Sequence, residues 1–362
     1  MTSDPKLSFI YQSSPSRVVF GAGDFSKAPE EIDRLGAKSA LIITTPGRRK
    51  LGEELAARLG SKAAGVFHRA VMHVPVETAE AGRAEAARLD ADCYVTIGGG
   101  SATGLAKAIA VVSGRPILCI PTTYSGSEMT SSWGITEGGI KKNARDPRAL
   151  PKTAIYDPAL TLSMPGKLSA TSGMNAVAHC VEALYAQDAN PIMSLIAEEG
   201  IRAMARGLPV VVKEPANLEA RSLALYGAWL GGVSLAGTTT ALHHKLCHIL
   251  GGAFDLPHSE THTVLLPHAT AYNAPGAPEA MERIARALGA KSAAQGLYNL
   301  EARMGAPLSL QSIGMKREGI EHAANLAVGN PFYNPRPLSK EGIRALLEDA
   351  FEGRAPREWP DG

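Results

Sequence analysis

The first 160 residues alternate short apolar runs with segments in which apolar positions recur at helical spacing. Apolar runs of strand length cover residues 18–20, 40–45, 93–97 and 116–121. Between them, residues 51–59 and 102–112 have the pattern of helices. Strands that are almost continuously apolar and alternate with helices are typical of a parallel sheet covered on both faces. The pattern therefore predicts an α/β domain in this half of the chain.

The pattern of residue types changes after residue 157, where long stretches rich in Ala, Leu, Glu and Arg replace the β-branched runs. Helical patterns cover residues 172–185, 193–206, 218–235 and 279–288. We place the boundary at residue 160 and expect a mostly helical second domain over residues 161–362. The last ten residues include Pro356 and Pro360, and we expect this tail to be frayed or loosely docked.

Composition and charge narrow the class of protein. Lys plus Arg total 37 and Asp plus Glu total 35, a net charge of +2 that argues against a nucleic-acid partner. The longest apolar runs are far shorter than the roughly 20 residues that span a bilayer, so we expect no membrane partner. The N-terminus lacks the pattern of a signal peptide. The four cysteines form no CxxC pair, which favours reduced thiols and a cytoplasmic location.

Two turns at the carboxyl ends of predicted strands have the chemistry of a nucleotide site. One is glycine-rich and opens a helix, so its backbone can approach a pyrophosphate beside the helix N-terminus. It is not a GxGxxG fingerprint, and tight packing at a turn is the alternative interpretation. The second turn follows the next strand and supplies hydroxyl groups. The predicted cofactor residues are Gly98, Gly99, Gly100, Ser101, Thr122, Thr123, Tyr124, Ser127 and, at the end of the strand over 40–45, Thr44.

The end of the strand over residues 40–45 also bears on the choice between NADH and NADPH. No carboxylate follows this strand, whereas Arg48 and Arg49 do. A carboxylate would repel the 2′-phosphate of NADPH, and a guanidinium can neutralise it. We therefore expect that NADPH is not excluded. The alternative is that Arg48 and Arg49 are only solvent-exposed residues at the start of a helix.

Histidines gather in one segment of the second domain. Five of the ten histidines in the chain fall within residues 237–262. On a helix His244 and His248 share one face, while His243 points about 100° away. His179 lies in a separate predicted helix. Histidines that converge from two helices are typical of a metal or catalytic site, although any one of them could be a hydrogen-bonded core residue.

These motifs together resemble the iron-containing alcohol dehydrogenases, which share a superfamily with dehydroquinate synthase. The resemblance covers essentially the whole chain, from the Gly98 turn and the segment 121–128 through Asp157–Pro158 to Asn334–Pro335–Arg336. It implies a doubly wound, Rossmann-like N-terminal sheet and an all-helical C-terminal domain, with the active site in the cleft between them. A homodimer is a further expectation from the family.

In that family an Asp and three His hold a divalent metal. The matching positions are Asn175, His179, His244 and His258. A neutral amide at Asn175 brings no negative charge, so the set should bind a divalent cation less well. Gly104 is a second departure, because the family usually has an Asp there. We expect no metal; if one is present, its ligands would be His179, His244 and His258.

The segments 243–248 and 254–258 resemble a branch of the family that acts in the bacterial breakdown of aromatic compounds. The branch uses NADH or NADPH to reduce an activated carbon–carbon double bond in a small dicarboxylate. Hydride addition gives an enolate, which hydrogen-bond donors or an imidazolium can stabilise and protonate. The predicted catalytic residues are His243, His248 and Lys245, and the predicted substrate-binding residues are Asn175, His179, His244, His258 and Arg336.

Three other functions stay open on the sequence. The first is a metal-dependent alcohol dehydrogenase that uses His179, His244 and His258. The second is a lyase of the dehydroquinate synthase type, although its phosphate-bearing substrate would favour a more basic site. The third is a protein with a decayed site that only binds a nucleotide or a partner.

Overall fold

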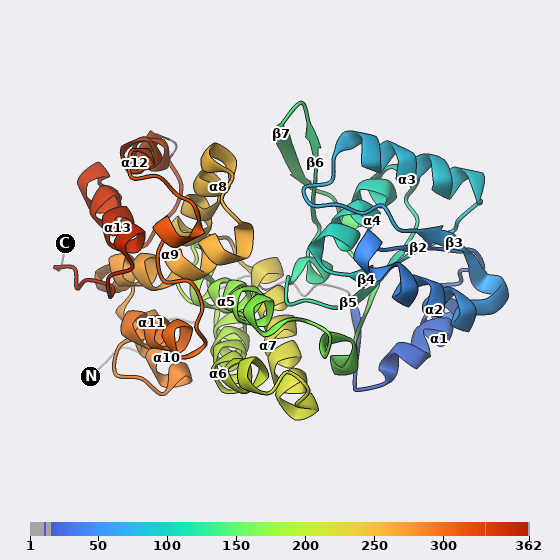
Figure 1. Cartoon of the computed structure of the whole chain (residues 1–362), viewed down its shortest axis with the longest axis horizontal. Helices are drawn as coiled ribbons and strands as arrows, with labels where there is room; N and C mark the ends of the chain where they lie inside the picture. Colours follow the sequence, from blue (N-terminus) through green and yellow to red (C-terminus); the bar gives the residue numbers. More distant parts are fainter. Residues whose placement is uncertain (1–10, 12–15, 330, 361–362) are drawn as a thin grey trace.

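The computed structural model describes residue 11, residues 16–329 and residues 331–360. Two parts lie side by side, a sheet with its helices in blue to green and a helical part in green to red (Figure 1). Among the residues described, no helix is long and apolar enough to cross a membrane.

The main sheet has, within the described residues, six parallel strands in the order β1-β8-β5-β4-β2-β3. Their bounds are β1 Arg17–Phe20, β2 Ala40–Ile43, β3 Ala63–Phe67, β4 Cys93–Gly98, β5 Ile117–Pro121 and β8 Thr153–Tyr156. The first helices are α1 Ala28–Arg34, α2 Arg49–Leu59, α3 Val76–Arg88 and α4 Gly100–Ser113.

Alternate residues of each strand enter opposite cores, as the pleat of a strand requires. On β2, Ile42 packs with Ile32 of α1 and Leu55 of α2. The next residue, Ile43, faces the other way and packs with Leu105 of α4. Helices therefore cover both faces, and the predicted doubly wound parallel sheet is confirmed.

The rest of the chain is helical, as predicted. Its α-helices are α5 Gly166–Ala183, α6 Pro191–Lys213, α7 Leu218–Gly237, α8 Leu242–Phe254, α9 His258–Asn273, α10 Pro278–Leu288, α11 Ala293–Arg303, α12 Gly319–Gly329 and α13 Lys340–Glu352. Helices α5, α6 and α7 share one large core. At Gly227 of α7 a Cβ would lie 2.8 Å from Cγ of Met204 on α6, so the missing side chain allows this close packing. We keep residue 160, between β8 and α5, as the proposed domain boundary.

Short 3-10 helices connect many of these elements. Their bounds are Asp24–Lys27, Pro46–Arg48, Gly60–Lys62, Ser127–Met129, Pro147–Ala149, Pro158–Thr161, Ala274–Gly276 and Gln311–Ile313.

An antiparallel hairpin that the sequence analysis did not predict projects from the sheet part (Figure 1). It is formed by β6 Ser132–Glu137 and β7 Ile140–Arg145. Its two-residue turn is Gly138–Gly139, with φ of +57° and +77°. Glycine adopts both angles without steric cost, which is why this pair suits a tight hairpin.

The segment after the second predicted nucleotide turn is held by a buried lysine. Nζ of Lys107, on α4, donates to the carbonyl oxygens of Ser127, Thr130 and Ser132 and to Oγ1 of Thr130, at 2.7–2.9 Å. Lys107 is only 1% exposed. Four oxygen acceptors around an ammonium group compensate for its burial and fix this segment against α4.

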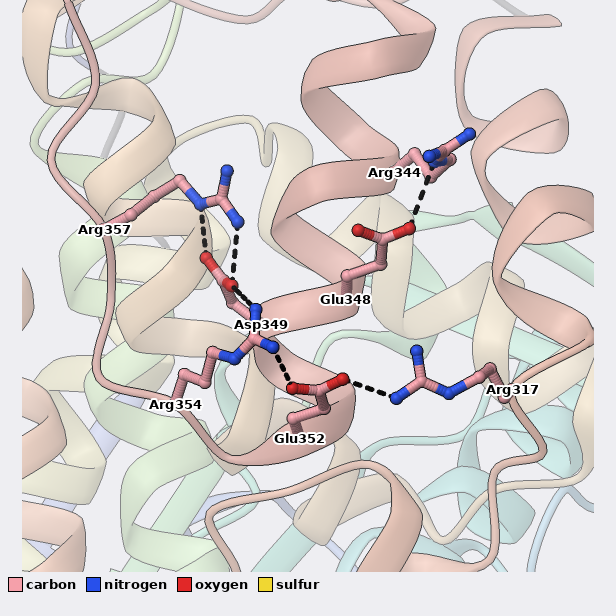
Figure 2. A network of polar contacts seen from close by, with 7 residues as sticks. All are labelled: Arg317, Arg344, Glu348, Asp349, Glu352, Arg354 and Arg357. Atoms are coloured by element: carbon pink, nitrogen blue, oxygen red, sulfur yellow. Dashed lines mark hydrogen bonds and ion pairs between the residues drawn. The ribbon is translucent and has the colours of Figure 1, made fainter.

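The tail after α13 is docked by several contacts, whereas we expected it to be frayed or only loosely docked. Arg357 forms a bidentate ion pair with buried Asp349, and Arg354 contacts the same carboxylate at 3.3 Å (Figure 2). The Trp359 ring lies 5.0 Å from the ring of Tyr272 on α9. A bidentate guanidinium–carboxylate pair and an aromatic contact together outweigh the two prolines as determinants of the tail.

We expect Asp349→Asn to lower the free energy of unfolding at neutral pH by about 2 kcal/mol, since charged hydrogen bonds are lost from a buried carboxylate. Burial raises the pKa of Asp349, but Arg357 and Arg354 outweigh burial and the pKa lies below its ordinary value. A lowered folded-state pKa adds stability above about pH 4 that is lost as the pH falls through the folded pKa.

The difference in Tm between the wild type and Asp349→Asn should therefore be largest at neutral pH and shrink below about pH 4. Glu348→Gln is the control, because it removes only the exposed pair with Arg344 and should change Tm little (Figure 2). An equal loss of Tm in both variants would contradict the role of Asp349.

Candidate active site

Histidines from three helices meet in one cluster. His244 of α8 lies at the centre, with ring centroids 4.8–6.2 Å from those of four other histidines. The ring of His258 lies 4.3 Å from that of His262. The cluster is formed by His179 of α5, His243, His244 and His248 of α8, and His258 and His262 of α9. The structure thus brings together every histidine that the sequence predicted for the site and adds His262.

Burial divides this histidine cluster in two. His179, His243, His244 and His262 are at most 5% exposed, whereas His248 and His258 are exposed. Burial lowers the pKa of His243 to about 4 and, with the neighbouring imidazoles, lowers the pKa values of the other buried rings well below the usual value. The inner rings are therefore neutral at pH 7.

Several buried polar atoms in and beside the cluster have no hydrogen-bond partner. They are Oδ1 of Asn175, Nδ1 of His179, Nε2 of His244 and both ring nitrogens of His262. A buried polar atom without a partner costs free energy, so an accumulation of such atoms is typical of a site that binds a ligand.

Glu182 of α5 is a site residue that the sequence analysis missed. Its carboxylate accepts a hydrogen bond from Nδ1 of His244 at 2.6 Å and another from the backbone N–H of His243 at 2.8 Å. The side chain is 1% exposed. The available signal was spacing: Glu182 follows Asn175 by seven residues and His179 by three, which places all three on one helical face.

The two predicted nucleotide turns lie against each other. A Cβ at Gly99 would come within 2.7 Å of Oγ1 of Thr123, so only glycine allows the two turns this close. Gly100 begins α4, whose first N–H groups have no partner within the helix. Gly99, Gly100, Ser101, Thr123 and Ser127 retain solvent exposure there.

The other predicted cofactor residues are buried. Thr44, Thr122 and Tyr124 are at most 1% exposed, and Gly98 is buried as well. The Tyr124 hydroxyl lies 3.5 Å from Nη1 of buried Arg221, and its backbone N–H donates to Oγ of Ser172. These residues are therefore part of the buried packing beneath the surface of the two turns.

The histidine cluster adjoins the second turn. Gly126 has φ +72°, a conformation that favours glycine. A Cβ there would lie 3.0 Å from Cα of Gly232 on α7 and 3.4 Å from Nδ1 of His179. The predicted cofactor edge of the sheet and the histidines therefore meet at Gly126.

Lys245 and Arg336 lie over aromatic rings outside the histidine cluster. Nζ of Lys245 lies 5.6 Å from the ring of Phe332. Arg336 donates to the carbonyl oxygen of Tyr272 and stacks on the rings of Tyr272 and Trp359. Tyr272 is ten residues from His262 along α9, roughly 15 Å of helical rise. The structure therefore does not bring Arg336 to the histidines.

The residues present do not fit the metal of the family well. Among the described residues, the side chains near enough to share an ion are His243, His244 and His262, not the expected trio of His179, His244 and His258. Nε2 of His243 donates to the carbonyl oxygen of His262, so this nitrogen is already engaged. Asn175 supplies no anionic oxygen, and at Gly104 a Cβ would lie 3.1 Å from Cγ2 of Val74, which leaves little room for a longer side chain.

Comparison with known families assigns the class of protein. Residues 15–158 match the family model "Iron-containing alcohol dehydrogenase", and residues 169–351 match "Fe-containing alcohol dehydrogenase family, C-terminal". The chain belongs to the iron-containing alcohol dehydrogenase family and is an oxidoreductase.

Its particular relatives within the family are maleylacetate reductases. The chain is 57% identical to that of Burkholderia cepacia over 348 residues, which cover 96% of this chain and 99% of the relative. It is 54% identical to that of Sphingobium indicum, over 97% of this chain and 99% of the relative. The crystal structure of maleylacetate reductase from Agrobacterium tumefaciens superimposes with a TM-score of 0.94 at 49% identity, covering 96% of this chain and 99% of that one.

Proposed function

We propose that the chain is a maleylacetate reductase, which uses NADH or NADPH to reduce the activated carbon–carbon double bond of maleylacetate and gives 3-oxoadipate. The observation that supports it on the structural side is the neutral buried cluster of imidazoles and an amide beside the second turn. A conjugated double bond accepts hydride without a Lewis acid, since the neighbouring ketone already withdraws electrons. The proposed reaction would belong to the bacterial degradation of aromatic compounds.

The proposed reaction balances as a hydride and a proton transfer. NADH or NADPH, when held at the two nucleotide turns, would supply the hydride, which would add to the alkene carbon remote from the ketone. The electron pair of the double bond moves to the ketone oxygen, and an enolate forms. A proton from the protein then adds to the neighbouring carbon and the ketone reforms. In sum, maleylacetate, NAD(P)H and a proton give 3-oxoadipate and NAD(P)⁺.

Solvent exposure suggests which residue donates the proton and which residues position the substrate. His248 is the proton donor that we propose, because it is exposed on α8 and can exchange its proton with water. His243 is fully buried with Nε2 bonded to a backbone carbonyl, so it suits positioning better than proton transfer. The proposed substrate residues are Asn175, His179, His244 and His258, with Lys245 as a partly exposed cation on the same helix as His244.

The first test follows the absorbance of NADH with maleylacetate, in protein treated with EDTA and assayed for bound metal. Rapid turnover without metal supports the proposal. No turnover until Fe²⁺ or Zn²⁺ is restored would favour the second candidate, a metal-dependent alcohol dehydrogenase, which the partnerless ring nitrogens of His179 and His244 keep open.

We also propose that both reduced cofactors are used at comparable rates. Nη1 of Arg48 donates to Oγ of Ser163 at 2.7 Å, and Arg49 pairs with Glu53, so Arg48 lies at the end of β2 without a carboxylate partner among the contacts described. Arg48→Ser should raise KM for NADPH by about tenfold, the value of one charged hydrogen bond, and leave KM for NADH unchanged. A wild-type preference of several hundredfold for NADH would refute the proposal.

A homodimer in the cytoplasm completes the proposal. Cys93, Cys119, Cys180 and Cys247 are buried free thiols, which suits a reducing compartment. The mass of the purified protein in solution, measured by light scattering, tests the dimer.

A further inference from the structure

We infer that Glu182 is a positioning residue of the proposed reaction: it holds His244 so that the ring presents Nε2, not Nδ1, to the substrate. The inference rests on the proposed function. It concerns a side chain that neither the motifs nor the donor set of the family includes.

The first ground is the set of contacts that the carboxylate makes. Helix α8 begins at Leu242, and its N-cap residue, Ala241, offers no side-chain acceptor. Glu182 of α5 supplies that acceptor from another helix: Oε1 accepts from the N–H of His243 at 2.8 Å. Burial raises the pKa of Glu182 above its ordinary value, and His243 and the backbone N–H groups at the start of α8 offset only part of that rise. The carboxylate thus takes the place of an N-cap side chain at the positive end of α8.

The second ground is the orientation of the ring. Oε2 of Glu182 lies 2.6 Å from Nδ1 of His244, so Nδ1 is the ring nitrogen that the carboxylate engages. Nε2 is then the ring nitrogen left for a ligand, and it is buried without a partner. His179 stacks on the same ring at 5.1 Å, and its Nδ1 is also without a partner. Nδ1 of His179 also lies 3.4 Å from the point where a Cβ would stand on Gly126, in the second nucleotide turn.

The third ground is that the Glu182 carboxylate makes two contacts with α8 at once. One carboxylate caps α8 through Oε1 and contacts the third residue of the helix through Oε2, so the cap fixes the group that orients the His244 ring. Groups that orient a functional histidine in this way typically contribute 10–100-fold to activity.

The test combines Glu182→Gln, which keeps an acceptor oxygen for the cap, with His244→Asn. We expect Glu182→Gln to lower kcat for maleylacetate by about 10–100-fold while Tm and the Kd for NADH stay near the wild-type values. In the double variant Glu182→Gln should cost little beyond His244→Asn, because Glu182 acts through His244. A merely structural role would give additive losses and a lowered Tm.

Glu301→Gln is the matched control, since Glu301 on α11 is equally buried and makes none of the histidine contacts. If Glu182→Gln fails to fold, Glu182→Asp withdraws the carboxylate by one methylene and takes its place in the same cycle. Unchanged kcat in a folded variant, or additive losses, overturns the inference. Absence of turnover by the wild type would instead overturn the proposed function, and the inference with it.

Discussion

Replacing His248 by alanine should lower kcat for maleylacetate by about 10²–10⁴-fold, the usual contribution of a general acid. His248 is exposed on α8, one helical turn from His244, so its loss removes the proposed proton donor without opening the core. Added imidazole should restore part of the lost rate, because the space left by the ring is open to solvent. Steady-state kinetics with and without imidazole measure both effects.

His322→Ala is the control for His248→Ala, since His322 is an exposed histidine on α12 whose ring lies against Phe254. It should keep the wild-type kcat. If His248→Ala retained near-wild-type kcat/KM, the proposed proton donor would be wrong; if His243→Ala did so as well, neither histidine would act in the reaction.

Asn175→Asp separates the two candidate functions most sharply. In the reductase a new carboxylate at this buried position would face a substrate that already carries two negative charges. Like charges about 4 Å apart repel by about 4 kcal/mol at an effective dielectric constant of 20. We therefore expect kcat/KM for maleylacetate to fall by at least about 100-fold. In a metal-dependent dehydrogenase the same change would restore the anionic ligand of the family and raise both metal content and activity.

The measurement for Asn175→Asp is kcat/KM together with metal content after dialysis against EDTA. Asn299→Asp makes the same change of charge at an exposed position on α11 and should leave both quantities unchanged. A variant that gains stoichiometric metal and dehydrogenase activity would refute the proposed reductase.

The elements that the sequence predicted well are those whose pattern is local. The strand that ends at Gly98 and the helix that follows it needed only an apolar run, glycines and a helical period. Strand β3 was missed because Ala63, Ala64 and Gly65 carry little strand propensity, and its place is set by pairing with β2. The β6–β7 hairpin does have a local signal in the sequence, the Gly138–Gly139 turn.

The site was predictable to the extent that it depends on residue types with few other uses. Histidines at helical spacing gave the cluster, whereas Glu182 resembles any helical glutamate until its partner, 62 residues away, is placed beside it. Arg336 illustrates the converse limit: a guanidinium suits a carboxylate substrate, but in the fold it is engaged by Tyr272 and Trp359. Long-range packing decides both cases.

The ammonium group of Lys107 has a consequence for how chelation experiments are interpreted. In many proteins a loop built on carbonyl oxygens needs a bound cation, and EDTA unfolds it. Here the cation in the oxygen cage is part of the chain, so no chelator can extract it. A loss of turnover after chelation would therefore come from elsewhere in the molecule than this loop.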